Sequence, residues 1–80
     1  MAKVFYPQAS SQIMANSPHP PDTEYKISIG TEMWGNIPAS VIKVQMVYKG
    51  KVNGRVVPSF PLGTDDYQRV RKAIDELLSR

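Results

Sequence analysis

Residues 40–49 read SVIKVQMVYK, a stretch in which apolar and polar side chains largely alternate. Ile42 and Val44 fall on one side of an extended chain, whereas Lys43 and Gln45 fall on the other. A period of two residues is typical of a β-strand that buries one face and exposes the other. The stretch therefore predicts a strand that packs against a core through its Ile42 face.

Two further strands are expected beside this one. Residues 23–30 alternate in the same way and place Tyr25 and Ile27 on the apolar side. Residues 55–60 predict the third strand, and because Pro58 has no N–H to donate, that strand belongs at a sheet edge. The first stretch then lies in the centre of an antiparallel meander.

The connections between these strands contain turn-forming residues. Asn53 and Gly54 both tolerate positive φ, so they form the favoured hairpin turn after the central strand. A turn or a bulge within residues 49–51 is the alternative. Residues 31–39 are expected to form a loop in which Trp34 covers the edge of the core.

The C-terminal segment has the spacing of an amphipathic helix. Over residues 65–79, one apolar stripe recurs at steps of three and four and consists of Tyr67, Val70, Ile74 and Leu77. Two acidic residues at the start, Asp65 and Asp66, suit the positive end of the helix dipole. We therefore expect an α+β fold, a three-stranded antiparallel β-meander with one C-terminal α-helix packed on one face (βββα).

The residues ahead of the first strand are rich in proline and serine. Prolines fix φ and cannot donate to a ladder, which disfavours helix and sheet around Pro7, Pro18, Pro20 and Pro21. Residues 1–23 are accordingly expected to form a flexible N-terminal arm, and residues 24–80 a single folded domain.

Composition excludes several classes of protein. The chain has 80 residues and no cysteine, so disulfides and thiolate metal sites are excluded. Small secreted domains usually carry disulfides, which makes a cytoplasmic setting the expectation. No window approaches the roughly 20 apolar residues of a membrane span, so no membrane partner is expected.

Residues that could carry catalysis are sparse. The one histidine, His19, lies between two prolines in the expected arm, where nothing holds it rigidly beside a reaction partner. Its spacing to Asp22 and Glu24 matches no established metal site. No glycine-rich phosphate-binding loop occurs. We therefore expect no enzyme, no metal, no cofactor and no small-molecule substrate.

Binding to a protein partner, or to a second copy of the chain, is the favoured function. Phe5 and Tyr6 give the arm an apolar tip that can add to another sheet or enter a groove. Trp34 belongs to a residue type enriched at interface hot spots. The expected partner-binding residues are therefore Phe5, Tyr6 and Trp34.

Nucleic-acid binding is the alternative function. The chain carries a net charge of +3, and residues 33–64 hold four basic residues and no acidic one. Some of the basic residues lie on predicted strands and others flank the predicted hairpin turn. The candidates for phosphate contacts are Lys26, Lys43, Lys49, Lys51 and Arg55. The excess is modest and the arm is apolar rather than basic, so protein binding remains the favoured prediction.

Overall fold

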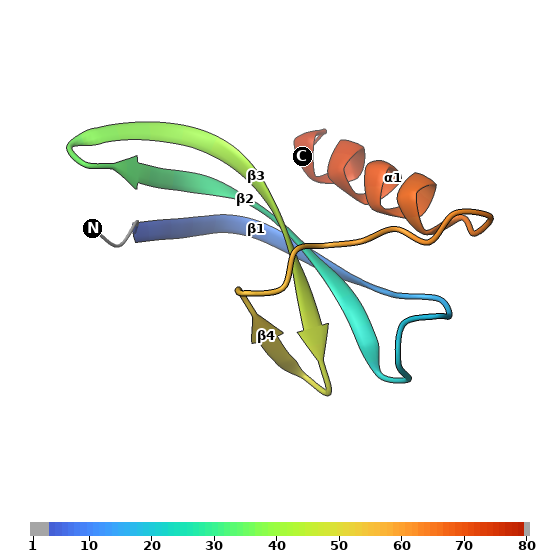
Figure 1. Cartoon of the computed structure of the whole chain (residues 1–80). Helices are drawn as coiled ribbons and strands as arrows, with labels where there is room; N and C mark the ends of the chain where they lie inside the picture. Colours follow the sequence, from blue (N-terminus) through green and yellow to red (C-terminus); the bar gives the residue numbers. More distant parts are fainter. Residues whose placement is uncertain (1–3, 80) are drawn as a thin grey trace.

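The computed structural model describes residues 4–79 as one antiparallel sheet with one helix (Figure 1). The strands are β1 (Val4–Met14), β2 (Thr23–Trp34), β3 (Ile37–Tyr48) and β4 (Lys51–Asn53), and helix α1 spans Asp66–Leu78. Each strand pairs with the next along the chain, so the sheet order is β1-β2-β3-β4. The predicted α+β meander with a C-terminal helix is confirmed, but it has four strands rather than three.

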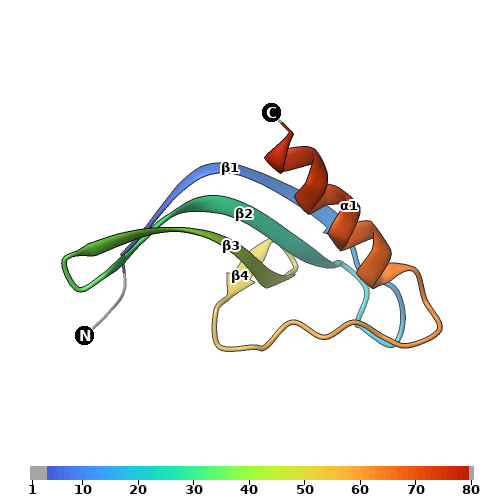
Figure 2. The same cartoon turned by 90° about the horizontal axis from the view of Figure 1, so that it is seen from above.

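Helix α1 packs across one face of the sheet (Figure 2). Side chains directly opposite each other on neighbouring strands share a face. The pairs Tyr25–Met46 and Ile27–Val44 therefore both point toward the helix, as their alternation predicts. Burying a large aliphatic side chain contributes roughly 1.5–3 kcal/mol. The buried centre consists of Tyr25, Ile27, Met46, Val70, Ala73 and Leu77.

The N-terminal arm that was expected to be flexible is strand β1. Residues 4–14 pair with β2 along their length, and residues 1–3 lie outside the described residues. β1 is an outer strand, and at a sheet edge a proline can direct its missing N–H to solvent without breaking the ladder. The prediction is wrong because Pro7 excludes a central strand and not an edge strand.

A close approach at Gly30 allows β1 to lie against β2. A Cβ on Gly30 would collide with the carbonyl oxygen of Tyr6 and would lie 2.9 Å from the Cα atom of Pro7. The pairing register shifts next to this point, between Pro7 and Ala9. Glycine is therefore required at position 30 because a side chain would not fit, and not because of a positive φ.

The connection between β1 and β2 is hydrogen-bonded rather than loose. The N–H of Ala15 donates to the carbonyl oxygen of Thr23 at 2.9 Å, and the N–H of His19 donates to that of Asn16 at 3.1 Å. The predicted arm thus continues into an ordered turn over residues 15–22.

The hairpin turn between β3 and β4 uses Lys49 and Gly50, with φ values of 51° and 82°. Two positive φ values are the signature of a type I′ turn. The favoured hairpin turn at Asn53-Gly54 is wrong and the alternative turn within residues 49–51 is confirmed, because Asn53 pairs with Met46 as the last residue of β4. The Asn53 side chain accepts a hydrogen bond of 3.0 Å from the N–H of Arg55. Such a turn ends a strand without reversing it.

The chain after β4 crosses toward the helix without strand pairing, so the third strand predicted over residues 55–60 is wrong. The loop predicted over residues 31–39 is also wrong. β2 and β3 continue through it and reverse at a tight turn of Gly35 and Asn36. The positive φ of Gly35, 67°, suits this turn and lets the two strands extend into one long hairpin.

Candidate functional site

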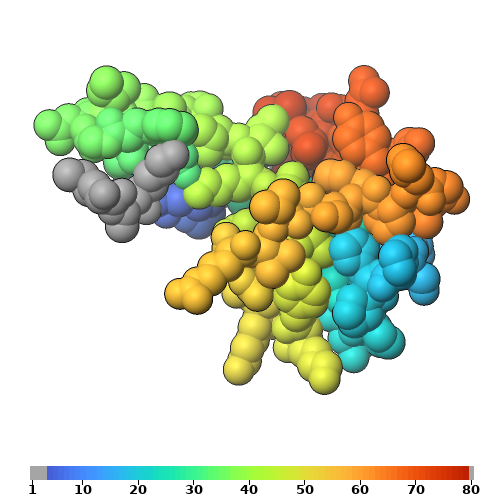
Figure 3. Space-filling view, viewed as in Figure 1, coloured from blue at the N-terminus to red at the C-terminus, as the bar shows by residue number. Residues whose placement is uncertain are grey.

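The sheet reaches well beyond the helix at one end. α1 covers the part of the sheet that contains Tyr25 and Met46, while the start of β1 and the β2–β3 hairpin extend away from it (Figures 1 and 2). Figure 3 shows this hairpin, in green, projecting from the body of the molecule. We name this end the distal surface; its large apolar side chains are Val4, Phe5, Tyr6, Met33, Trp34 and Ile37.

Several side chains of the distal surface are open to solvent. Tyr6 is 57% exposed, Trp34 is 51% exposed and Ile37 is 69% exposed. Large apolar side chains that cluster on the outside of a small domain mark an interaction site more often than isolated ones do. The distal surface is therefore the first candidate site.

The structure places the three residues that the sequence marked for partner binding at one end of the sheet, with Phe5 and Trp34 on one face and Tyr6 on the other. Phe5 and Tyr6 lie opposite Glu32 and Thr31 of β2, close to Trp34 at the end of the same strand. Neighbouring residues of a strand point to opposite faces. Tyr6 therefore lies on the helix side of the sheet, and Phe5 lies on the face away from the helix, which we call the open face. The distal surface is consequently apolar on both of its sides.

The predicted partner-binding residues do not include the other members of the distal surface. Ile37 and Met33 fall in residues assigned to a loop, and Val4 in residues assigned to the arm. The alternation of Val4 with Tyr6, and the β-branched character of Ile37, were the available signals. These signals cover only a few residues each, and the neighbouring Pro7 and Gly35 are stronger signals for a loop.

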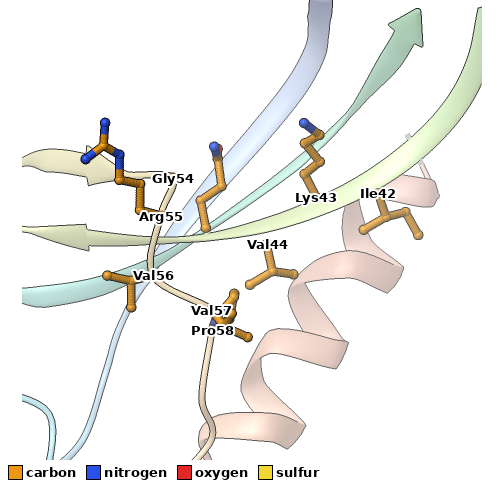
Figure 4. A pocket seen from close by; sticks show the side chains of 9 residues that line it. Ile42, Lys43, Val44, Gly54, Arg55, Val56, Val57 and Pro58 are labelled. Carbon is orange, nitrogen blue, oxygen red and sulfur yellow. The ribbon is translucent and has the colours of Figure 1, made fainter. Parts of the chain in front are cut away.

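The basic residues do not form one surface. Lys26 and Lys43 lie on the open face, opposite Gln45 and Ser28 respectively, whereas Lys49 and Lys51 lie at the β3–β4 turn. Arg55 follows β4 and points to the same side of β3 as Lys43 (Figure 4). Lys26 and Lys43 therefore share one face of the sheet, whereas Lys49 belongs to the turn and not to a strand.

The charge of Lys43 is already compensated. Its ammonium group forms an ion pair with the carboxylate of Glu32, which is only 5% exposed, and lies 4.9 Å from the centre of the Phe5 ring. A buried carboxylate needs such a partner because desolvation penalises an isolated charge. Lys43 therefore has a structural role, and it is a weaker candidate for a phosphate contact than its position on the strand suggested.

A groove separates the outer edge of β3 from the segment that follows β4. It has a volume of about 410 Å³ and runs beside residues 42–45 on one side and residues 54–58 on the other. Figure 4 shows that Ile42, Val44 and Val56 lie on one side of β3, while Lys43 and Arg55 rise from the other. The groove is thus amphipathic, with an apolar floor and a basic rim.

A buried carboxylate joins the helix to the rest of the fold. Asp66 has no exposed surface and accepts hydrogen bonds from the backbone and side chain of Asn16, from the Tyr25 hydroxyl and from the Arg69 guanidinium, at 2.6–3.0 Å. Burial alone would raise its pKa, but these hydrogen bonds outweigh burial and hold the pKa of Asp66 below its ordinary value. The sequence assigned Asp66 only to the helix dipole.

The same junction changes the titration of Tyr25. Burial, together with the hydrogen bond to the negative carboxylate of Asp66, raises the pKa of the Tyr25 phenol well above its ordinary value. The phenol therefore stays protonated and donates. Every oxygen of Asp66 is engaged, so the group is a structural junction and has no free position for a substrate.

His19 is held by a structural contact. Its Nε2 atom lies 2.8 Å from the carbonyl oxygen of Ser59, which can only accept, so the ring donates. Its ring also meets the edge of Tyr25, with centroids 5.7 Å apart. Within residues 4–79, no cluster of three or more acidic, histidine or cysteine side chains is arranged to hold a metal ion.

No helix in the described part of the chain has the length and apolar character that a membrane crossing requires. No family model, no curated protein and no solved structure matches the chain.

Proposed function

We propose that the protein is a non-enzymatic binding protein that associates with a second copy of itself through the distal surface. The observation that carries the proposal is the high exposure of Tyr6, Trp34 and Ile37 on a part of the sheet that the helix leaves bare. A chain of 80 residues buries a smaller share of its surface on folding than a larger domain does. Covering these side chains would remove further apolar surface from water.

Charge favours a second copy as the occupant. In a two-fold interface each patch meets itself, so a patch with a net charge would repel its partner. The two charged side chains in the middle of this end of the sheet, Glu32 and Lys43, neutralise each other in an ion pair. The remaining large side chains are apolar, which makes the surface complementary to its own copy.

Sedimentation equilibrium of the full chain tests this proposal. The mean mass of the wild-type protein should rise from monomer toward dimer as concentration increases. Tyr6→Glu places a charge on the helix side of the distal surface, and Ile37→Glu places one on the opposite side. The substitution on the side that forms the interface should keep the protein monomeric. Gln68→Glu adds the same charge at an exposed position of α1 and should behave as wild type. A wild-type monomer at every concentration, or dimers of both distal variants, would refute the proposal.

Nucleic-acid binding is the second candidate, and one observation favours it. Among the described residues, Lys26, Lys49, Lys51 and Arg55 form no ion pair. Free cations of this kind can neutralise phosphates, and on duplex DNA log K then falls by about 0.9 per contact for each unit of log salt. Binding that weakens steeply with salt and is lost in Lys26→Glu/Lys49→Glu, but not in Lys72→Glu, would support this function over the first.

A further inference from the structure

The outer edge of β3 has a stretch without a neighbouring strand. β4 pairs only with the last residues of β3, from Met46 to Tyr48. In the two-residue turn that follows, Tyr48 and Lys51 form the closing pair, so the backbone groups of Tyr48 face β4. Backbone groups alternate between the two sides of a strand. Every second residue before Tyr48 therefore turns its N–H and C=O outward, including Ser40, Ile42 and Val44.

This open stretch is bounded at both ends. β4 covers the edge from Met46 onward, and Pro38, which falls in the same outward series, has no N–H to offer. No backbone hydrogen bond links Ser40, Ile42 or Val44 to a loop of the described chain. The edge therefore presents a short, defined set of donors and acceptors, which is the requirement for adding one strand.

The two sides of the edge select different side chains. An added strand would direct alternate side chains to opposite faces. One set would enter the groove beside Ile42, Val44 and Val56, and Val57 in the wall of that groove is 79% exposed. The other set would face the basic rim, where Arg55 is exposed and forms no ion pair among the described residues.

We propose that the β3 edge binds an extended segment of a partner protein in which apolar and acidic residues alternate. Charge complementarity carries the choice of occupant, since Arg55 beside the groove forms no ion pair among the described residues and residues 33–64 contain no acidic residue. A second copy of this chain fits less well, because neither β1 nor β3, its edge-forming long strands, contains an acidic residue. This site uses different residues from the distal surface and does not depend on self-association there.

Fluorescence polarisation with a labelled peptide that alternates valine and glutamate tests the inference. The peptide should bind the wild-type protein, and a peptide with lysine in place of glutamate should not. Arg55→Glu should weaken binding by about tenfold or more, the effect of losing a charge-assisted hydrogen bond. Lys72→Glu makes the same charge change at an exposed position of α1 and should leave binding unchanged.

A backbone test separates strand addition from simple charge attraction. The valine–glutamate peptide with N-methylated amides keeps its charge but cannot donate to the edge, so it should bind at least tenfold more weakly. In the complex with the unmodified peptide, the amide resonances of Ser40, Ile42 and Val44 should shift. Equal binding of the lysine or N-methylated peptide, or equal effects of Arg55→Glu and Lys72→Glu, would overturn the inference. Excess Tyr6→Glu protein should not release the bound peptide. Release would show that a second copy occupies the edge, and it would overturn the inference as well.

Discussion

The hydroxyl of Tyr25 donates a hydrogen bond of 2.7 Å to the carboxylate of Asp66, and Asp66 is completely buried. The two residues are 41 positions apart and belong to the second strand and the first turn of the helix. Arg69 and Asn16 complete the shell around the same carboxylate. The orientation of α1 on the sheet therefore depends on a polar contact as well as on the apolar stripe.

Asp66→Asn should destabilise the fold by about 1–3 kcal/mol, since a neutral amide cannot accept all the hydrogen bonds that Asn16, Tyr25 and Arg69 donate to this buried position. Urea unfolding of the two proteins measures the difference. Asp65→Asn is the matched control, because Asp65 also pairs with Arg69 but its side chain is 66% exposed. It should cost less than about 1 kcal/mol. Equal losses in the two variants would show that burial of Asp66 does not matter.

Tyr25→Phe should cost about 1–3 kcal/mol, the range for leaving buried hydrogen-bond partners unsatisfied. The ring and its contact with Phe60, at 5.2 Å between centroids, remain in this variant. The hydroxyl alone is lost, together with its bonds to Asp66 and to the carbonyl oxygen of Ser59. A free energy of unfolding within a few tenths of a kcal/mol of the wild-type value would show that these hydrogen bonds do not stabilise the fold.

The stability of the protein should decrease in acid through Asp66. Its pKa is lower in the folded state than in the unfolded state. Between the two values the unfolded chain binds more protons, so stability rises with pH and its full contribution is present above the ordinary carboxyl pKa of about 4. Below that value the contribution is lost as pH falls through the folded pKa. Asp66→Asn should flatten this part of the curve of unfolding free energy against pH, and an unchanged curve would contradict the assignment.

Gly30→Ala should displace β1, since the new Cβ would meet the Tyr6 carbonyl oxygen and the Pro7 backbone. Overpacking of this kind costs roughly 1–3 kcal/mol, which thermal or urea unfolding would measure. Gly54→Ala is the control, because its Cβ would have no neighbour within 4 Å. That substitution should be neutral or slightly stabilising. A Gly30→Ala protein as stable as Gly54→Ala would show that β1 does not pack as described.

The parts of the fold that the sequence predicts are those in which one periodic pattern dominates. The helix stripe with Val70 and Leu77, and the alternation around Ile27 and Val44, bury side chains as expected. Strand β1 is not predicted because Pro7 counts as evidence against any strand in a pattern analysis, although a proline excludes only a central strand and not an edge strand. The Lys49-Gly50 turn is not favoured because Asn-Gly is the stronger local signal for a hairpin turn. The pairing of Val47 with Val52 places the turn at Lys49-Gly50 instead.

The candidate sites are only partly visible in the sequence. Phe5, Tyr6 and Trp34 stand out by residue type, but their proximity follows from the pairing of β1 with β2. The junction at Asp66 joins Asn16 and Tyr25 to the helix across long sequence separations, and no local pattern encodes such contacts. Pairing of Lys43 with Glu32 likewise depends on the register between β2 and β3.

Intermolecular NOE measurement on a mixture of isotope-labelled and unlabelled protein tests the central claim of self-association most directly. The proposed dimer predicts contacts between the ring protons of Tyr6 or Trp34 in one copy and the methyl groups of Val4, Met33 or Ile37 in the other. Intermolecular NOEs confined to residues outside the distal surface, or none at the highest concentration reached, would contradict it.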